Sequence, residues 1–289
     1  MTEWARARKP DCEFQALGVG AYLRSMAVGA KTDLEKRALE YVRYSGELVS
    51  SYRAEAHLAG RGNDSCARLD IEEVLCDRIA KYSGMDAQDV FVFPNGMAAV
   101  YSLHRALRLM FPDRKTVQYD FPYVDVLRVQ REFGRGAHFQ PLASVESLEK
   151  LRELIAGEKL AGVFCEMPSN PLLRCADIRA IGEMLTGKDV PLIVDDTVAS
   201  SVNISLREYA DVTTTSLTKF FSGAGDVMGG AVVLNSKSPH YAALKAAMAR
   251  EGVKEAVFEP GKLAQSNRQG RKIMQSYFRK KGVTVSFSA

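Results

Sequence analysis

The stretch Val190-Pro191-Leu192-Ile193-Val194-Asp195 is apolar until it ends in a carboxylate. A short apolar run of this kind predicts a buried β-strand. Similar runs and helical patterns occur along the chain, with strands predicted at 90–93, 116–119, 160–166, 192–195, 212–216 and 230–234 and helices near 97–110, 144–156, 176–186 and 239–250. Because strands alternate with helices, we predict an α/β layer fold with a mainly parallel sheet.

One more helix is predicted ahead of these strands. Asp70 stands where a helix N-cap is expected, and Glu73 has the capping-box position three residues later. The apolar stripe of this helix consists of Ile71, Val74, Leu75, Ile79 and Tyr82. Residues 1–60 are mixed in composition and lean towards helix, without a clear motif.

Polar residues stand at the ends of several predicted strands. They are Asn95-Gly96, Glu166, Asp195 and Ser216. Ligands of parallel α/β sheets bind at the carboxyl ends of the strands. We therefore expect these residues to meet at one ligand site.

The residues around Lys219 indicate which ligand this is. Lys219 follows Ser216-Leu217-Thr218 and comes about two dozen residues after Asp195. A partly desolvated lysine has a lowered pKa, which frees its amine to attack an aldehyde. The hydroxyls of Ser216 and Thr218, with the backbone N–H groups of Asn95-Gly96-Met97, can hold a phosphate. Asp195 can keep a pyridine nitrogen protonated, so this set of residues predicts a site for pyridoxal 5'-phosphate (PLP).

Each of these residues also has a structural interpretation. Lys219 resembles a solvated surface lysine, and Ser216 and Thr218 resemble turn formers. Asp196 competes with Asp195, because successive strand residues face opposite sides of a sheet. Three aromatic residues could stack on a cofactor ring or pack in the core, namely Tyr119, Phe121 and Tyr123.

Other classes of site are disfavoured. The glycines at 223, 225, 229 and 230 depart from the dinucleotide-binding spacing, and the histidines at 57, 104, 138 and 240 are too scattered for a metal site. The five cysteines, at 12, 66, 76, 165 and 175, form no CxxC pair and are expected to be reduced thiols.

The composition is that of an ordinary globular protein, with 46% apolar and 26% charged residues in 289. No apolar run approaches the roughly 18 residues of a membrane span, and no signal-peptide stretch begins the sequence, so a cytoplasmic location is expected.

Residues 261–289 hold seven basic and no acidic residues, which leaves 32 bases against 35 acids elsewhere. The net charge of +4 therefore comes from the tail, and nucleic-acid binding is not expected.

Taken together, the motifs resemble the Cys/Met-metabolism family of PLP enzymes. The matching stretches are Asn95-Gly96-Met97-Ala98-Ala99, Pro168-Ser169-Asn170-Pro171-Leu172, Val194-Asp195-Asp196-Thr197, Ser216-Leu217-Thr218-Lys219 and Gly225-Asp226-Val227-Met228-Gly229-Gly230. The resemblance covers roughly 60–250, and Phe121-Pro122-Tyr123-Val124-Asp125 is similar to fungal cystathionine γ-synthase-like proteins.

The resemblance implies a role for each matching residue. Lys219 would carry the cofactor as a Schiff base and shuttle protons, and Asp195 would pair with the pyridine nitrogen. Gly96, Met97, Ser216 and Thr218 would hold the phosphate, Tyr123 would stack on the ring, and Asn170 would orient the cofactor. Arg61 would be a phosphate ligand, although the Tyr-x-Arg pair of the family lacks its tyrosine here and the arginine is displaced by one.

The resemblance also implies a fold and an activity. The expected fold is the large domain of fold-type-I PLP transferases at 61–250, after a helical or irregular segment at 1–60 and before an irregular basic tail at 251–289, with the small C-terminal domain and its substrate-binding arginine largely absent. The expected activity is γ-replacement on an activated homoserine ester in trans-sulfuration and methionine biosynthesis. Alternatives are the same step in specialised metabolism, an eliminating lyase, and an inactive truncated partner protein. The expected partners are small amino-acid substrates and further copies of the chain, as a homodimer or homotetramer.

Overall fold

The computed structural model describes residues 15–19, 23–27, 40–46, 66–223 and 227–250. Two short strands, β1 (Gln15–Val19) and β2 (Leu23–Ala27), pair with each other antiparallel, and residues 40–45 are helical. The main body contains strands β3 (Val90–Phe93), β4 (Lys115–Tyr119), β5 (Ala137–Gln140), β6 (Leu160–Glu166), β7 (Leu192–Asp195), β8 (Val212–Ser216) and β9 (Gly230–Leu234). Its helices are α4 (Cys66–Ser83), α5 (Gly96–Met110), α6 (Val124–Phe133), α7 (Val145–Gly157), α8 (Ile178–Leu185), α9 (Ser200–Asn203) and α10 (Tyr241–Arg250), with short helical turns η1 (Ala87–Asp89) and η2 (Leu217–Phe221).

The seven strands form one sheet in the order β3-β9-β8-β7-β6-β4-β5. The pairs from β5 to β8 are parallel, whereas β9 is antiparallel to both of its neighbours. The predicted mainly parallel α/β sheet is therefore confirmed. Because β3 and β8 both run opposite to β9, the carboxyl end of β3 lies at the same edge as that of β8.

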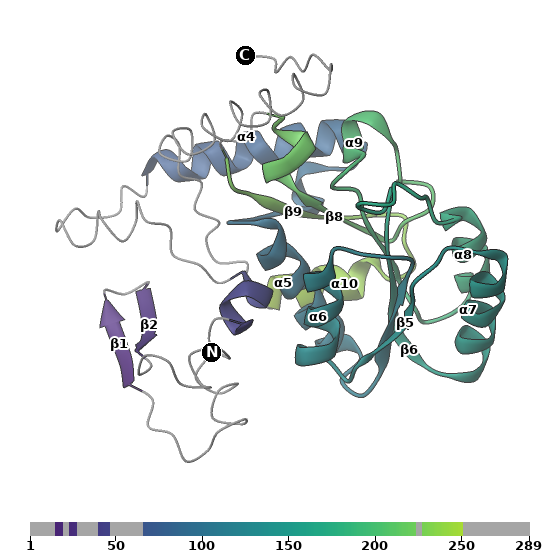
Figure 1. The fold of residues 1–289 in the computed structure, drawn as a ribbon. Coiled ribbons are helices and arrows are strands. Elements are labelled where there is room, and N and C mark those ends of the chain that lie inside the picture. Colours follow the sequence, from purple (N-terminus) through teal and green to yellow (C-terminus); the bar gives the residue numbers. More distant parts are fainter. Residues whose placement is uncertain (1–14, 20–22, 28–39, 47–65, 224–226, 251–289) are drawn as a thin grey trace, which may run out of the picture.

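Helices cover both faces of the sheet (Figure 1). On one face, α5, α6 and α10 pack against side chains such as Phe164, Ile193 and Val232. On the other face, α7 and α8 pack against Val163 and Leu192, and α4 covers the end near β3 and β9. The apolar strand runs are buried on both sides for this reason, which explains why they read as continuous rather than alternating patterns.

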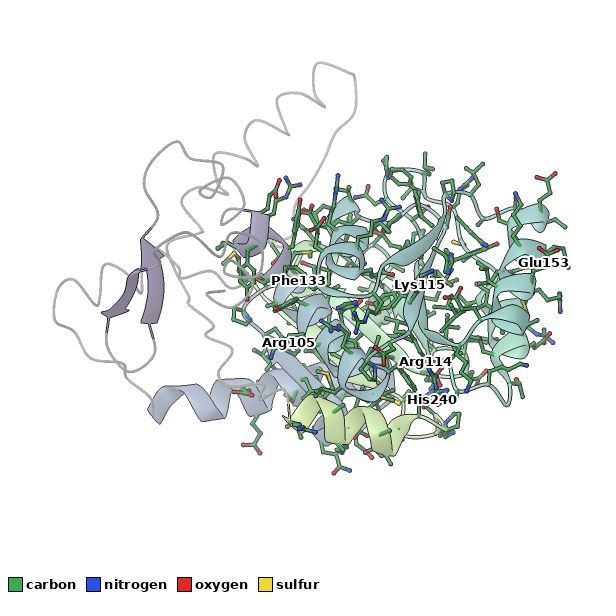
Figure 2. The ribbon with its side chains drawn as sticks, turned by 90° about the horizontal axis from the view of Figure 1, so that it is seen from below. Arg105, Arg114, Lys115, Phe133, Glu153 and His240 are labelled. Atoms are coloured by element: carbon green, nitrogen blue, oxygen red, sulfur yellow. The ribbon has the colours of Figure 1, made fainter. Side chains whose placement is uncertain are left out.

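The two ends of the sheet differ in character. At the amino-terminal end, Arg114 Nη2 lies 3.0 Å from Asp189 Oδ2, and His240 Nδ1 lies 4.0 Å from Asp189 Oδ1. Figure 2 shows Arg114, Lys115 and His240 at this end of the molecule. Ion pairs occupy this end, whereas the opposite end holds the cavity described below.

Several expectations about the elements are corrected. Asp70 is not an N-cap, because α4 begins at Cys66 and extends through the helix-forming residues before it. The stripe predicted for this helix is only partly buried, since Ile79 is 2% exposed but Val74 and Tyr82 are each 48% exposed. The strands β1 and β2 lie inside the segment predicted as helical or irregular, because these two short runs pair locally with each other.

The basic tail at 251–289 lies outside the described residues. Within the described residues, no helix combines the length and apolar character that crossing a bilayer requires.

Candidate active site

A cavity of about 430 Å³ opens at the carboxyl ends of the parallel strands. Its walls come from α5, β6, β7, β8, η2 and the residues that follow these strands. Eight of the nine residues predicted for the site line this cavity, namely Gly96, Met97, Tyr123, Asn170, Asp195, Ser216, Thr218 and Lys219. Arg61, the ninth, lies outside the described residues. The fold thus brings together residues that are up to 123 positions apart in the sequence.

The N-terminus of α5 forms one wall of the cavity. Asn95 caps this helix, because its Oδ1 accepts a hydrogen bond from Ala98 N at 2.9 Å. The first N–H groups of the helix, those of Gly96 and Met97, have no acceptor within the helix. Together with the positive end of the helix dipole, they provide a binding site for an anion such as phosphate.

Gly96 allows α5 to approach β8 closely. A Cβ atom at Gly96 would lie 2.9 Å from Ser216 Cβ and 3.1 Å from Ser216 Oγ. These distances are shorter than ordinary van der Waals contacts. The glycine therefore places the Ser216 hydroxyl beside the free N–H groups of the helix.

We expect Gly96→Ala to destabilise the fold by about 1–3 kcal/mol, because the added methyl group would displace Ser216. Urea denaturation measures this change. Gly157→Ala is the matched control, since a Cβ at Gly157 would meet no atom within 4 Å. The control is expected to change stability by less than about 1 kcal/mol, in the stabilising direction. Equal effects of the two substitutions would show that the close approach at Gly96 is not required.

Asp195 ends β7 and faces the cavity. Its Oδ1 accepts a hydrogen bond from Thr197 N at 2.9 Å, and the Thr197 hydroxyl in turn accepts one from Ser216 N at 2.8 Å. Burial raises the pKa of Asp195, while the hydrogen bonds from Thr197 oppose this rise. A positively charged N–H group placed beside Asp195 would stabilise its ionised form.

Asp196 faces away from this cavity. It is 1% exposed and accepts a hydrogen bond from the Thr215 hydroxyl. Burial raises the pKa of Asp196 to about 7. Of the two adjacent carboxylates, Asp195 is therefore the one available to a ligand in the cavity.

Lys219 lies in η2, immediately after β8, and lines the cavity. Its side chain is exposed in this single chain, so the partial desolvation expected from its strand-end position is not found. Lys219 Nζ makes no hydrogen bond or ion pair with the residues that the structure describes. The neighbouring Thr218 hydroxyl accepts a hydrogen bond from Gly229 N at 3.2 Å, which holds the segment before β9 against η2.

Glu166 is a cavity residue to which the sequence alone assigned no role. It ends β6, is 5% exposed, and accepts a hydrogen bond from Tyr123 N at 2.9 Å. Burial, and then the nearby charge of Asp195, raise the pKa of Glu166 to about 8. Its place at the end of a predicted strand had put it among the residues expected to meet at one ligand site, and it is in register with Asp195 on the adjacent strand.

The raised pKa of Glu166 predicts a pH dependence of stability. As pH rises from about 4.5 to about 8, the folded chain retains a proton that the unfolded chain releases, so stability falls. The slope per retained proton is about 1.4 kcal/mol per pH unit. Glu166→Gln is expected to remove the contribution of Glu166 to this slope, leaving the contributions of Asp195 and Asp196, whose pKa values are also raised. Urea denaturation of the wild type and Glu166→Gln across this pH range measures how the free energy of unfolding depends on pH. Identical slopes for the two proteins would contradict the raised pKa of Glu166.

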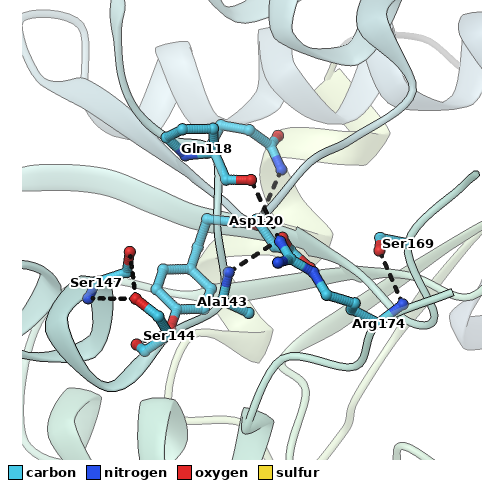
Figure 3. A network of polar contacts seen from close by, with 9 residues as sticks. Gln118, Asp120, Ala143, Ser144, Ser147, Ser169 and Arg174 are labelled. Carbon is cyan, nitrogen blue, oxygen red and sulfur yellow. Dashed lines mark hydrogen bonds and ion pairs between the residues drawn. The ribbon is translucent and has the colours of Figure 1, made fainter. Parts of the chain in front are cut away.

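The loop that carries Asn170 is fixed by a buried ion pair. Arg174 Nη2 donates to Asp120 Oδ1, which also accepts a hydrogen bond from Ala143 N at 3.1 Å (Figure 3). Ser169 N donates to Arg174 O at 2.7 Å, which closes the loop. Asp120 is fully buried, so this network holds Asn170 in place from outside the cavity.

The structure separates the three aromatic residues considered for stacking. Tyr119 is 2% exposed and packs in the core on the α7 and α8 face of the sheet. Phe121 is exposed but does not line the cavity, whereas Tyr123 is 47% exposed and does line it. Of these three residues, Tyr123 is therefore the one available to a ligand. Thr197 and Arg43 also line the cavity, although no local sequence pattern predicted roles for them.

The sequence matches the family model described as Cys/Met metabolism PLP-dependent enzyme over residues 68–283. The chain belongs to this family. PLP is the cofactor of the family, and the expected likeness to fungal cystathionine γ-synthases is confirmed. Cystathionine gamma-synthase of Neurospora crassa is 39% identical over 165 residues, which are 55% of this chain and 27% of that protein. A cystathionine gamma-synthase-like enzyme of Amanita muscaria is 36% identical over 168 residues, 55% of this chain and 28% of that protein.

Solved structures of the family have the same fold. Cystathionine gamma synthase from Xanthomonas oryzae pv. oryzae, in complex with aminoacrylate and cysteine, superposes with a TM-score of 0.53 at 25% identity. The superposition covers 66% of this chain and 47% of that chain. The chain thus spans about a quarter of the length of these two curated relatives and about half of this solved chain.

The residues of the cavity fit PLP. The α5 N-terminus and Ser216 offer donors for a phosphate, and Asp195 offers a buried carboxylate. Lys219 offers an amine that has no partner among the described residues. These groups have the types that the phosphate, pyridine nitrogen and aldehyde of PLP require. The site geometry and the family therefore indicate the same cofactor.

Proposed function

We propose that this chain binds PLP in the cavity at the carboxyl edge of its sheet and carries out γ-replacement on an activated homoserine ester. The observation that carries the proposal is that Asp195, Ser216, Thr218 and Lys219 line one cavity with the N-terminus of α5. The similarity to fungal cystathionine γ-synthases supports this substrate class.

The proposed binding roles follow from the contacts of each residue. The N–H groups of Gly96 and Met97, with the hydroxyls of Ser216 and Thr218, hold the phosphate. Asp195 is oriented by Thr197 and holds a proton on the pyridine nitrogen. Tyr123 covers one face of the ring, and Asn170 fixes the orientation of the cofactor. Arg61 is retained as a proposed phosphate ligand.

PLP, when bound, supplies an aldehyde that reacts with amines and a protonated ring that withdraws electrons from the substrate. Lys219 Nζ is proposed to remove the proton from the substrate Cα, because it is the amine that lines the cavity. A second deprotonation, at Cβ, allows the γ-ester to leave. The ester group leaves as a carboxylate. The thiol of cysteine then adds at Cγ and gives up its proton, and protons return to Cβ and Cα, which gives a thioether product.

Turnover of O-acylhomoserine with cysteine by the purified, PLP-treated protein tests this proposal. The expected result is formation of cystathionine, detected by mass spectrometry, at a rate that depends on both substrates. Cystathionine formation by a protein that binds no PLP would contradict the proposed site. PLP binding without turnover of any acylhomoserine, with cysteine or with other thiol and carbon nucleophiles, would overturn the proposed reaction and favour an inactive partner protein.

The assembly and location are also proposals. We propose that copies of the chain associate as a homodimer or homotetramer in the cytoplasm, as expected from the resemblance to the family. Sedimentation equilibrium distinguishes these states from a monomer, and a monomer at micromolar concentration would contradict the proposed association.

A further inference from the structure

Residues 40–46 form a wall of the cavity that no motif of the family predicted. Tyr41 and Tyr44 are 3% and 9% exposed, and Tyr41 packs edge-on against Phe133 with ring centroids 5.5 Å apart. These contacts fix the short helix to the core beside α5 and α6. Arg43, between the two tyrosines, lines the cavity.

The same segment is tied to the N-terminus of α5. Asn95 Nδ2 donates to Gly46 O at 2.8 Å while Asn95 Oδ1 caps the helix. Gly46 has φ +67°, and a Cβ there would lie 2.4 Å from Ala98 N. Because only glycine fits this approach, the segment is held in a defined position next to the proposed phosphate site.

Arg43 is held by one buried carboxylate. Arg43 Nε donates to Asp125 Oδ2 at 2.8 Å, and the side chains of the two residues are 60% and 3% exposed. Donation through Nε leaves the terminal amino groups of a guanidinium to other acceptors. The Tyr123 side chain, which also lines the cavity, interacts with both Arg43 and Asp125. Among the described residues, Asp125 is the carboxylate with which Arg43 forms an ion pair.

Two cationic side chains are available to an anion in the cavity. The described charged residues that line it are Arg43, Glu166, Asp195 and Lys219. The raised pKa of Glu166, about 8, keeps this side chain mainly neutral at pH 7. Two cations and the Asp195 carboxylate therefore line the cavity, and the Asp125 carboxylate lies behind Arg43. Arg43 is the cation whose guanidinium geometry matches the oxygens of a carboxylate or phosphate.

We propose that Arg43 is an anion-binding residue of this cavity, positioned by Asp125, and that it holds either the phosphate of PLP or the carboxylate of the amino-acid substrate. The inference deepens the proposed function and rests on it for the identity of the anion. It assigns a role in ligand binding to residues 40–46, within the same chain as Lys219.

Binding measurements on Arg43→Gln test the proposal with five ligands. Inorganic phosphate and PLP carry the phosphate, whereas pyridoxal lacks it. In PLP-treated protein, L-norleucine carries the carboxylate, whereas L-norleucinamide lacks it. Arg43→Gln is expected to weaken binding of one member of one pair, PLP or L-norleucine, about tenfold, while binding of the counterpart that lacks the phosphate or the carboxylate stays unchanged. A merely structural role of Arg43 would weaken both members of a pair equally.

Three further variants test the charge of Arg43, its positioning by Asp125, and a surface arginine as a control. Arg43→Lys keeps the charge and is expected to restore part of the lost affinity. Asp125→Asn is expected to weaken the same ligand by a smaller factor, because Arg43 loses its fixed position. Arg128→Gln is the matched control, since Arg128 is exposed on α6 and does not line the cavity.

The outcomes separate the two proposals. If Arg43→Gln binds every ligand as the wild type does, the inference about Arg43 is wrong while the proposed function stands. If the wild type binds no PLP, the proposed function fails. The role of Arg43 is then tested by comparing the binding of inorganic phosphate to the wild type and to Arg43→Gln. Phosphate binding that is weakened about tenfold in Arg43→Gln then supports the inference, whereas equal binding, or none, overturns it.

Discussion

Replacement of Lys219 by alanine is expected to abolish the visible absorption band that the wild-type protein acquires when PLP is added. The band requires an amine at the aldehyde of the cofactor, and Lys219 Nζ is the amine that lines the cavity. Turnover of acylhomoserine is expected to fall by at least about a thousandfold, because the same amine moves the proton at the substrate Cα. Absorption titration and the cystathionine assay measure the two effects.

Lys188→Ala is the control for this prediction. Lys188 is exposed in the segment before β7, at the opposite end of the sheet from the cavity. Its replacement is expected to leave both the band and turnover unchanged. A band of wild-type intensity in Lys219→Ala would show that another lysine holds the cofactor.

Replacement of Asp195 by asparagine is expected to weaken PLP binding by about a hundredfold or more. Removing one partner from a buried charge pair costs roughly 3–5 kcal/mol, which corresponds to this range. Asparagine keeps an oxygen that can accept the hydrogen bond from Thr197 N, so the geometry of the strand end is preserved and the loss of charge is isolated. Titration with PLP followed by absorption or fluorescence gives the affinity.

Asp196→Asn is the matched control, because Asp196 is the adjacent carboxylate on the other side of the strand. It bonds the Thr215 hydroxyl, an interaction that asparagine can also make. PLP affinity is expected to change less than about threefold in this variant, since the residue does not line the cavity. Should Asp196→Asn lose affinity while Asp195→Asn retains it, the roles of the two carboxylates would have to be exchanged.

Much of the fold could be predicted from local patterns. The buried strands, such as Leu160–Glu166, form continuous apolar runs because helices cover both faces of the sheet. The strand β5 (Ala137–Gln140) was not predicted, since it is only four residues long, lies at the edge of the sheet and is only partly buried. The helix α6 was also missed, although Val126, Val129 and Phe133 repeat at helical spacing.

Some residues of the site could likewise be predicted from the sequence, and others could not. Residues at strand ends, such as Asp195 and Ser216, could be predicted because the direction of parallel strands brings their carboxyl ends together. Arg43 could not, because its pairing with Asp125 joins positions 82 residues apart with no repeating pattern between them. The hydrogen bond from Ser216 N to the Thr197 hydroxyl likewise depends on the register of β7 with β8, which the sequence alone does not specify.

The central claim is that the cavity at the carboxyl edge of the sheet places PLP at Lys219. Borohydride reduction of the PLP-treated protein, followed by proteolysis and mass spectrometry, tests this claim most directly. The predicted result is a single pyridoxyl modification on the peptide that contains Lys219. Modification spread over several exposed lysines, or confined to a lysine outside the cavity, would contradict it.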